Sequence, residues 1–145
     1  MDRYRSQVRE VINRNTVITL ALGQGFNAFL PVYDGGVDLV LHRESDNKLH
    51  KVQLKGRWII DKKYVGRDIW IAFPINGEWH LMPHDKMVEF AELEGITKTK
   101  SWVEGGAYSK ARPSEVTIAQ CAPYKFAPIA EVAGEAADEA ETSEA

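Results

Sequence analysis

Three polar residues stand close together in a stretch that is otherwise typical of buried strands. Asp38 interrupts the apolar run from Val37 to Leu41, and Gln53 and Lys55 follow on the next apolar segment. A carboxylate in such a strand is costly to desolvate unless it is paired or binds a cation. Because side chains two residues apart on a strand share a face, Gln53 and Lys55 are expected to point the same way.

This set of residues suits metal-dependent phosphodiester hydrolysis. Mg²⁺ (or Mn²⁺) takes hard oxygen ligands, here the Asp38 carboxylate, the Gln53 amide oxygen and the main-chain carbonyl of Leu54. The metal would activate a water molecule, and Lys55 would orient that water or help to deprotonate it. The competing interpretation is a plain cross-strand ion pair between Asp38 and Lys55, because this spacing also arises by chance.

Periodicity and turn residues predict the elements that position these side chains. Apolar residues recur at three- and four-residue spacing from Tyr4 to Leu22, which indicates a helix that ends near Gly23. A short extended piece is expected at 26–32. Strands are expected at 37–42, 49–54, 69–75 and 78–82, the first two joined by the polar loop 43–48 and the last two by Asn76-Gly77, a strong hairpin signal.

Two helices separated by a loop are predicted after the second hairpin. A helix is expected at 84–94, followed by a loop-like segment at 97–113 and a last helix at 114–121 with Ser114 as its N-cap. Pro74, inside an expected strand, argues for an edge or strand-end position. Helix, hairpin strands and then helices is an α+β order with a mixed central sheet, rather than a doubly wound parallel one.

The segment from Gly25 to Met82 resembles the PD-(D/E)xK nuclease superfamily. It contains a glycine, a proline near a turn, a strand bearing Asp38, a hairpin, and a strand that ends in Gln53-Leu54-Lys55. It is most similar to the branch that writes the second motif as QxK, which includes an intron-homing endonuclease and Holliday-junction-resolvase-like proteins. The resemblance implies a restriction-endonuclease-like core with flanking helices, with Asp38 and Gln53 as metal ligands and Lys55 as the catalytic lysine.

One feature of that superfamily is out of place in this chain. The family usually carries a metal-facing glutamate in the first helix, expected here between Val11 and Asn15, where no acid occurs. Glu10, just upstream, is therefore assigned this role. If Glu10 did not reach the site, Asp38 alone would supply negative charge to the metal.

Basic residues gather around the expected catalytic strand and indicate a polyanion as partner. Contacts to phosphates are expected from five of them: Lys51, Arg57, Lys62, Lys63 and Arg67. The alternative is a merely solvated face. DNA is the expected partner, RNA stays open, and cutting both strands with so small a domain would require a homodimer or homotetramer.

Length and charge predict one domain with an acidic extension. The chain has 145 residues, and residues 129–145 hold six acids and no base. Residues 1–128 are expected to form the nuclease-like domain and 129–145 a disordered tail. No apolar run is long enough for a membrane span, and the first residues do not read as a secretory signal, so the expected location is the cytoplasm.

The sequence therefore favours a Mg²⁺-dependent DNA endonuclease or junction-cleaving phosphodiesterase. A second hypothesis is a catalytically degenerate module on the same fold that binds nucleic acid or protein, favoured by the absence of an acid at the helix positions where the family carries its glutamate. A third is a structural or regulatory oligomer without a nucleic-acid partner, which the net charge of −3 weakly supports.

Overall fold

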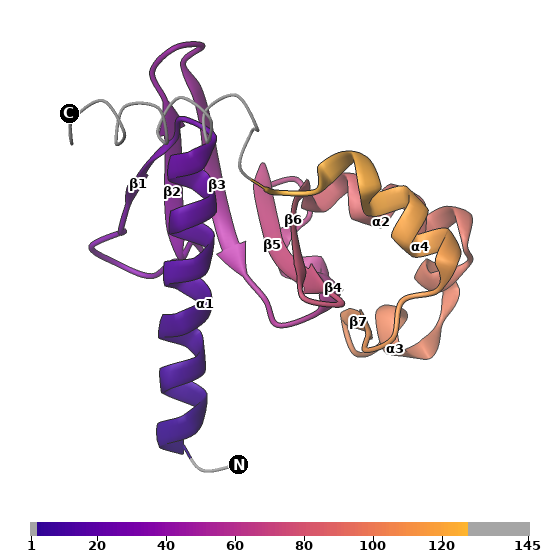
Figure 1. The fold of residues 1–145 in the computed structure, drawn as a ribbon. Coiled ribbons are helices and arrows are strands. Elements are labelled where there is room, and N and C mark those ends of the chain that lie inside the picture. The colour runs from indigo at the N-terminus through magenta and orange to yellow at the C-terminus, as the bar shows by residue number, and fades with distance from the viewer. Residues whose placement is uncertain (1–2, 128–145) are drawn as a thin grey trace, which may run out of the picture.

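The structure, a computed structural model, describes residues 3–127. The tail at 129–145 lies outside the described residues. A mixed central sheet separates helix α1 (Arg3–Gly23) from helices α2 (His84–Leu93) and α4 (Glu115–Cys121), as Figure 1 shows. The predicted α+β class with a mixed sheet is confirmed.

The central sheet has five strands in the order β1-β2-β3-β5-β6. These are β1 (Asn27–Phe29), β2 (Leu39–Arg43), β3 (Lys48–Leu54), β5 (Ile69–Ile75) and β6 (Glu78–Pro83). Only β3 and β5 run parallel, with Gln53 opposite Ile71, and the other neighbours are antiparallel. The sheet thus consists of an antiparallel three-stranded unit, β1 to β3, joined to the β5–β6 hairpin through one parallel pair.

Two apolar cores cover the two faces of this sheet. On one face Val17 and Ala21 of α1 pack over Leu39, Leu41 and Val52. On the other face the alternate residues of β5, from Ile69 to Ile75, pack with α2 and with a smaller sheet. This alternation is the period of two that a strand imposes on its side chains. The site described below lies where α1 meets the end of β3.

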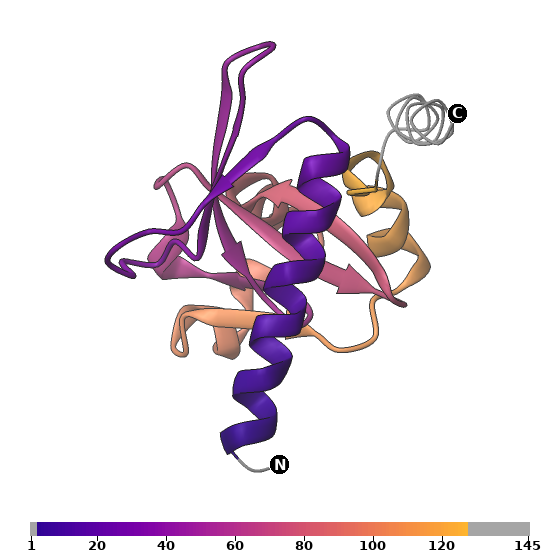
Figure 2. The same cartoon turned by 60° about the vertical axis from the view of Figure 1, so that its left-hand side comes forward.

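The N-terminal half of α1 extends past the sheet (Figures 1 and 2). Within α1 only Val17 and Ala21 are buried, both in its C-terminal half. The helix is followed by Gly25, whose φ of +84° is in the left-handed region that commonly ends helices. The predicted helix from Tyr4 to Leu22 agrees with the observed one within a residue at each end.

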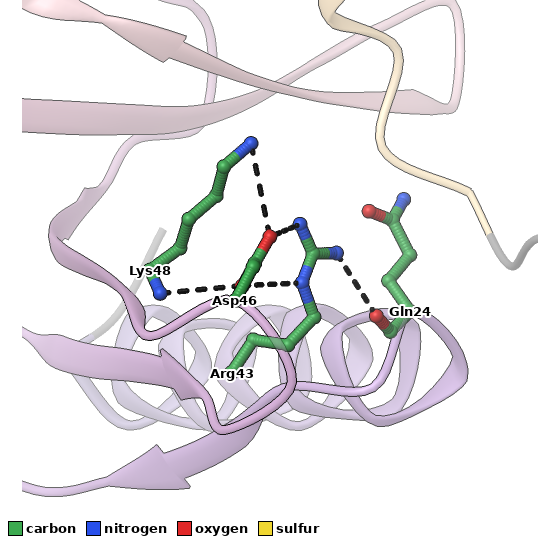
Figure 3. Close-up of polar contacts among 4 residues, drawn as sticks. All are labelled: Gln24, Arg43, Asp46 and Lys48. Atoms are coloured by element: carbon green, nitrogen blue, oxygen red, sulfur yellow. Dashed lines mark hydrogen bonds and ion pairs between the residues drawn. The ribbon is translucent and has the colours of Figure 1, made fainter.

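The hairpin between β2 and β3 is tied to the end of α1 by one arginine (Figure 3). The Arg43 guanidinium donates to both carboxylate oxygens of Asp46, at 3.1 and 2.8 Å, and to the main-chain oxygen of Gln24 at 3.2 Å. The same guanidinium lies 4.5 Å from the centre of the Phe26 ring. The hydrogen bonds from Arg43 lower the pKa of Asp46 to about 2.

The second hairpin, between β5 and β6, forms at Asn76-Gly77 as predicted. Both residues have positive φ, 51° and 79°, as a tight two-residue hairpin turn with the right-handed twist of its strands requires. Pro74 faces Trp79 on β6, beyond the point where β3 stops pairing with β5. Its missing N–H therefore interrupts no bond to β3, which agrees with the predicted strand-end position.

The prediction of a loop over 97–113 is wrong. That segment holds the end of a short 3₁₀ helix (Ile96–Lys98), helix α3 (Lys100–Val103) and strand β7 (Ala107–Lys110). Strand β7 pairs with β4 (Trp58–Asp61), which was also missed and is followed by a 3₁₀ turn (Lys62–Tyr64). A further 3₁₀ turn (Ala122–Tyr124) follows α4, whose predicted N-cap is confirmed because Ser114 Oγ accepts from Thr117 N. Four-residue strands carry too short a pattern to be recognised alone.

No helix within 3–127 has both the length and the apolar character that crossing a membrane requires.

Candidate active site

A cleft of about 690 Å³ opens between α1, the segment before β2 and the end of β3. Four of the residues singled out by sequence line it together, namely Glu10, Asp38, Gln53 and Lys55. Leu54 lines it as well. Glu10 thus lines the same cleft as the motif residues, from the position on α1 just before the range in which the family pattern predicts an acid.

Two hydrogen bonds to main-chain groups of β3 fix Asp38 beside the cleft. It directly precedes β2, and its N–H donates to the Val52 oxygen at 2.8 Å. Its Oδ2 accepts from the N–H of Leu54, also at 2.8 Å. The second carboxylate oxygen is not engaged by these bonds and can face the cleft.

Burial raises the pKa of the Asp38 carboxyl above its ordinary value. The hydrogen bond from Leu54 and the charge of Lys55 act in the opposite direction, whereas the nearby carboxylates of Asp34 and Glu10 raise the pKa further. A cation bound beside Asp38 would offset the effects of burial and of these two neighbouring carboxylates.

Gln53 supplies an oxygen with no partner. Its Oε1 is buried, and no atom of the described residues hydrogen-bonds to it. A buried amide oxygen without a partner is uncommon, because its desolvation is then uncompensated.

In an extended strand the carbonyl of a residue points to the same edge as its N–H. Because the N–H of Leu54 donates to Asp38 Oδ2, the carbonyl of Leu54 also points toward the edge of β3 where Asp38 lies.

Lys55 sits just past the end of β3. Its N–H donates to the Ala72 oxygen on β5 at 2.9 Å, which continues the parallel pairing by one step. Its Nζ lies 5.7 Å from the centre of the Tyr64 ring, within the range of a cation–π contact. Lys55 lines both this cleft and a second pocket that is described below.

The oxygen donors at this cleft fit a hard divalent cation. Residues 3–127 hold no group of three or more His, Cys, Asp or Glu side chains placed to hold a metal ion. The cleft instead presents carboxylates from Asp38 and Glu10 with the unpartnered amide oxygen of Gln53. Mg²⁺ and Mn²⁺ accept such sets and fill their remaining positions with water.

Two further cleft residues escaped the sequence prediction. Asp34 lines this cleft and also the second pocket described below. Its side chain accepts a hydrogen bond from the N–H of Gly36 at 3.0 Å, and the sequence indicated only this turn. Arg14 lines the cleft with a buried Nε that has no hydrogen-bond partner among the described residues. Its spacing of four residues from Glu10 puts both on one helical face, a signal that was available in the sequence.

A second pocket of about 420 Å³ adjoins the first and is cationic. It shares Asp34, Gln53 and Lys55 with the main cleft and adds the side chains of Lys63 and Arg67. Gly36 allows the approach of Arg67, since a Cβ there would lie 3.3 Å from its Nη1, and its φ of +93° favours glycine. The pocket is therefore suited to an anion next to the carboxylates.

The other predicted phosphate contacts lie in different places. Lys51 Nζ donates to the main-chain oxygen of Arg67 at 2.8 Å, beside the cationic pocket. Lys62 Nζ donates to the Val103 oxygen at 3.1 Å and lies over the Trp102 ring, so it points to α3 and lines neither pocket. Arg57 is exposed after β3 and lines neither pocket.

Comparison with known proteins gives a distant likeness among solved structures. No protein-family model matches the chain, and no curated protein matches it. Among solved structures the chain is similar to a bacterial homing endonuclease, I-Ssp6803I, with 17% identity and a TM-score of 0.49 over 75% of this chain and 80% of that one. A likeness of this size carries no argument about function, which is drawn below from the cleft itself.

Proposed function

We propose that the protein is a metal-dependent DNA endonuclease of the PD-(D/E)xK type, acting on duplex or branched DNA. The observation that carries this is one cleft that combines a partly buried carboxylate, an unpartnered amide oxygen and a lysine. The D…QxK motif noted in the sequence supplies all three. The adjoining cationic pocket provides room for the phosphates on either side of the cut.

Each residue has a definable part in phosphodiester hydrolysis. Asp38 and Gln53, with the carbonyl of Leu54 and the carboxylate of Glu10, would hold Mg²⁺ or Mn²⁺. When bound, the ion supplies charge stabilisation and lowers the pKa of a coordinated water. Lys55 orients the attacking water and stabilises charge on the phosphate oxygens, and because it lines both pockets it lies next to both groups.

The test is a nicking assay on supercoiled and branched DNA with Mg²⁺ or Mn²⁺. The chain should cut, and Lys55→Ala should lower the rate by at least about 100-fold, since it removes a group that acts on the reacting water. DNA affinity of Lys55→Ala should fall only a few-fold, because several other cations remain. Lys100→Ala, on the exposed surface of α3, is the matched control. Wild-type chain that cuts neither DNA nor RNA with either metal contradicts the proposal.

A second candidate function is a module that binds nucleic acid without cutting it. The observation that favours it is Gln53 itself, because a neutral ligand lowers the negative charge available to a cation. Gln53→Glu separates the two. In a weakly charged but working site it should tighten Mg²⁺ binding, measured by calorimetry, whereas a site that no longer binds metal should gain no affinity.

Cutting both strands of a duplex needs two active sites. One cleft of this kind is present in the described part of the chain, so we expect two copies arranged about a two-fold axis, as a homodimer or homotetramer.

A further inference from the structure

The end of β1 and the chain that follows it form an exposed apolar loop. Phe29 and Leu30 are 49% and 57% exposed, and Val32 and Tyr33 are 107% and 82% exposed. The segment that joins β1 and β2 projects from the molecule at the left of both views (Figures 1 and 2). Isolated apolar residues on a surface need no explanation, but a contiguous run of them marks a contact surface.

The base of this loop is part of the candidate active site. Leu30 and Pro31 line the main cleft, and Gly35 lines the cationic pocket. Arg67 Nη2 donates to the Gly35 oxygen at 2.9 Å, which fixes the base of the loop beside the phosphate-facing side chains. The Tyr33 ring lies against Gly35, since a Cβ there would be only 3.1 Å from its Cε1. The apolar tip is thus held at a definite place next to the cleft.

We propose that Val32 and Tyr33 contact the bases of the DNA substrate beside the cut phosphate and favour sites whose bases unstack easily. This rests on the proposed nuclease function and specifies its substrate class. Apolar side chains can enter between base steps, and an aromatic ring can stack on a base that has left the helix. Unstacking is least costly where a base is mismatched, bulged or at a junction.

The surroundings of the loop favour DNA over a second copy of the chain as its partner. Lys55, Lys63 and Arg67 line the same pocket as Gly35 at the base of the loop, and Val32 and Tyr33 are the most exposed of its large apolar residues. A nucleotide presents the same two chemistries side by side, an anionic phosphate and a flat apolar base. Cations at the edge of an apolar patch are therefore complementary to a DNA strand lying across the cleft.

The experiment measures binding of two DNA duplexes of equal length, one fully paired and one with a single-base bulge. A fluorescent adenine analogue beside the bulge reports unstacking, and the Lys55→Ala background prevents cutting. The double variant Val32→Ser with Tyr33→Ser should weaken binding of the bulged duplex about tenfold or more, since one stacked base is lost. It should abolish the fluorescence change and leave the salt dependence unaltered. Tyr33→Phe should keep the affinity.

Leu93→Ser is the matched control, because Leu93 is 84% exposed on α2, across the sheet from α1. If the double variant binds both duplexes as the Lys55→Ala parent does, the loop proposal is overturned while the nuclease proposal stands. If it changes only the oligomeric state in size-exclusion chromatography, the loop is a contact between copies and the proposal is likewise overturned. If the wild-type chain neither binds nor cuts DNA, both proposals fall.

Discussion

At the scale of single residues, Asp38 combines two opposing effects. Its Oδ2 is fixed by the N–H of Leu54, yet burial and the carboxylates of Asp34 and Glu10 disfavour its charge. The folded protein therefore holds a proton on Asp38 more tightly than the unfolded chain does. Stability from this group is present at low pH and is lost as the pH rises through the raised pKa.

Asp38→Asn should separate stability from metal binding. The amide still accepts the Leu54 N–H but carries no charge, so without metal near neutral pH the variant should have a Tm no lower than that of the wild type. Toward acidic pH the two melting temperatures should converge, because Asp38 becomes protonated. Adding Mg²⁺ should raise the Tm of the wild type and not of the variant, since only the wild type offers the charged ligand.

The outcome that contradicts this account is a metal-free variant that melts well below the wild type near neutral pH. The ionised Asp38 carboxylate would then stabilise the fold. Burial and the neighbouring carboxylates of Asp34 and Glu10 would not be the dominant effect on its charge. Thermal melts in matched buffers with and without metal decide between the two.

At the scale of elements, Lys110 joins the smaller sheet to two helices. Its Nζ lies 2.7 Å from Glu94 Oε2 and 2.7 Å from Thr117 Oγ1, and 4.5 Å from the centre of the Trp58 ring. The Lys110 side chain is only 12% exposed, and Thr117 is buried. The Lys110 ammonium group thus links β7 to β4, to the end of α2 and to α4.

Lys110→Met should destabilise the fold by about 2 kcal/mol, because it leaves partners of a charged hydrogen bond unsatisfied. Lys100→Met is the control: the Lys100–Glu104 pair is largely exposed at 3.8 Å, so its loss should cost less than about 0.5 kcal/mol. Denaturant unfolding measures both. Nicking per folded molecule should be unchanged, because Lys110 does not line the cleft. Equal losses in both variants would show that the buried network adds nothing.

At the scale of the whole molecule, the basic side chains are not one continuous patch. Lys63 and Arg67 line the pocket next to the carboxylates, whereas Lys62 points to Val103 and Trp102. Neighbours in sequence are therefore directed to different surfaces, and only one of these surfaces adjoins the cleft.

Replacing Lys63 and Arg67 with Gln should lower the salt dependence of DNA binding. Each lost phosphate contact reduces the slope of log K against log salt by about 0.9, so the double variant should lose roughly 2 in slope. Lys62→Gln should leave the slope unchanged and is the matched control. A fluorescence-anisotropy titration at several salt concentrations measures this. Equal effects of Lys62 and Lys63 would show that the whole basic run acts as a diffuse field.

The sequence alone determined the parts of this protein that depend on short-range pattern and turn chemistry. The sequence predicted the long helix α1 and the β2–β3 and β5–β6 hairpins close to their observed bounds. It also predicted the N-cap at Ser114. The shared face of Gln53 and Lys55 follows from the period of a strand, and both residues line one cleft with Asp38. These features rest on residues near one another in the chain.

Only the tertiary structure decided what depends on distant pairing. Strand β4 exists because Trp58–Asp61 pairs with Ala107–Lys110, far along the chain, and neither piece has a pattern long enough to be recognised alone. The packing of α1 and of the loop before β2 brings Arg14 and Asp34 into the cleft, although the sequence did not predict them there. Lys62, predicted to contact phosphates, instead donates to the Val103 oxygen. Which side chains share a cleft is set by contacts between elements, and periodicity within one element carries no information about them.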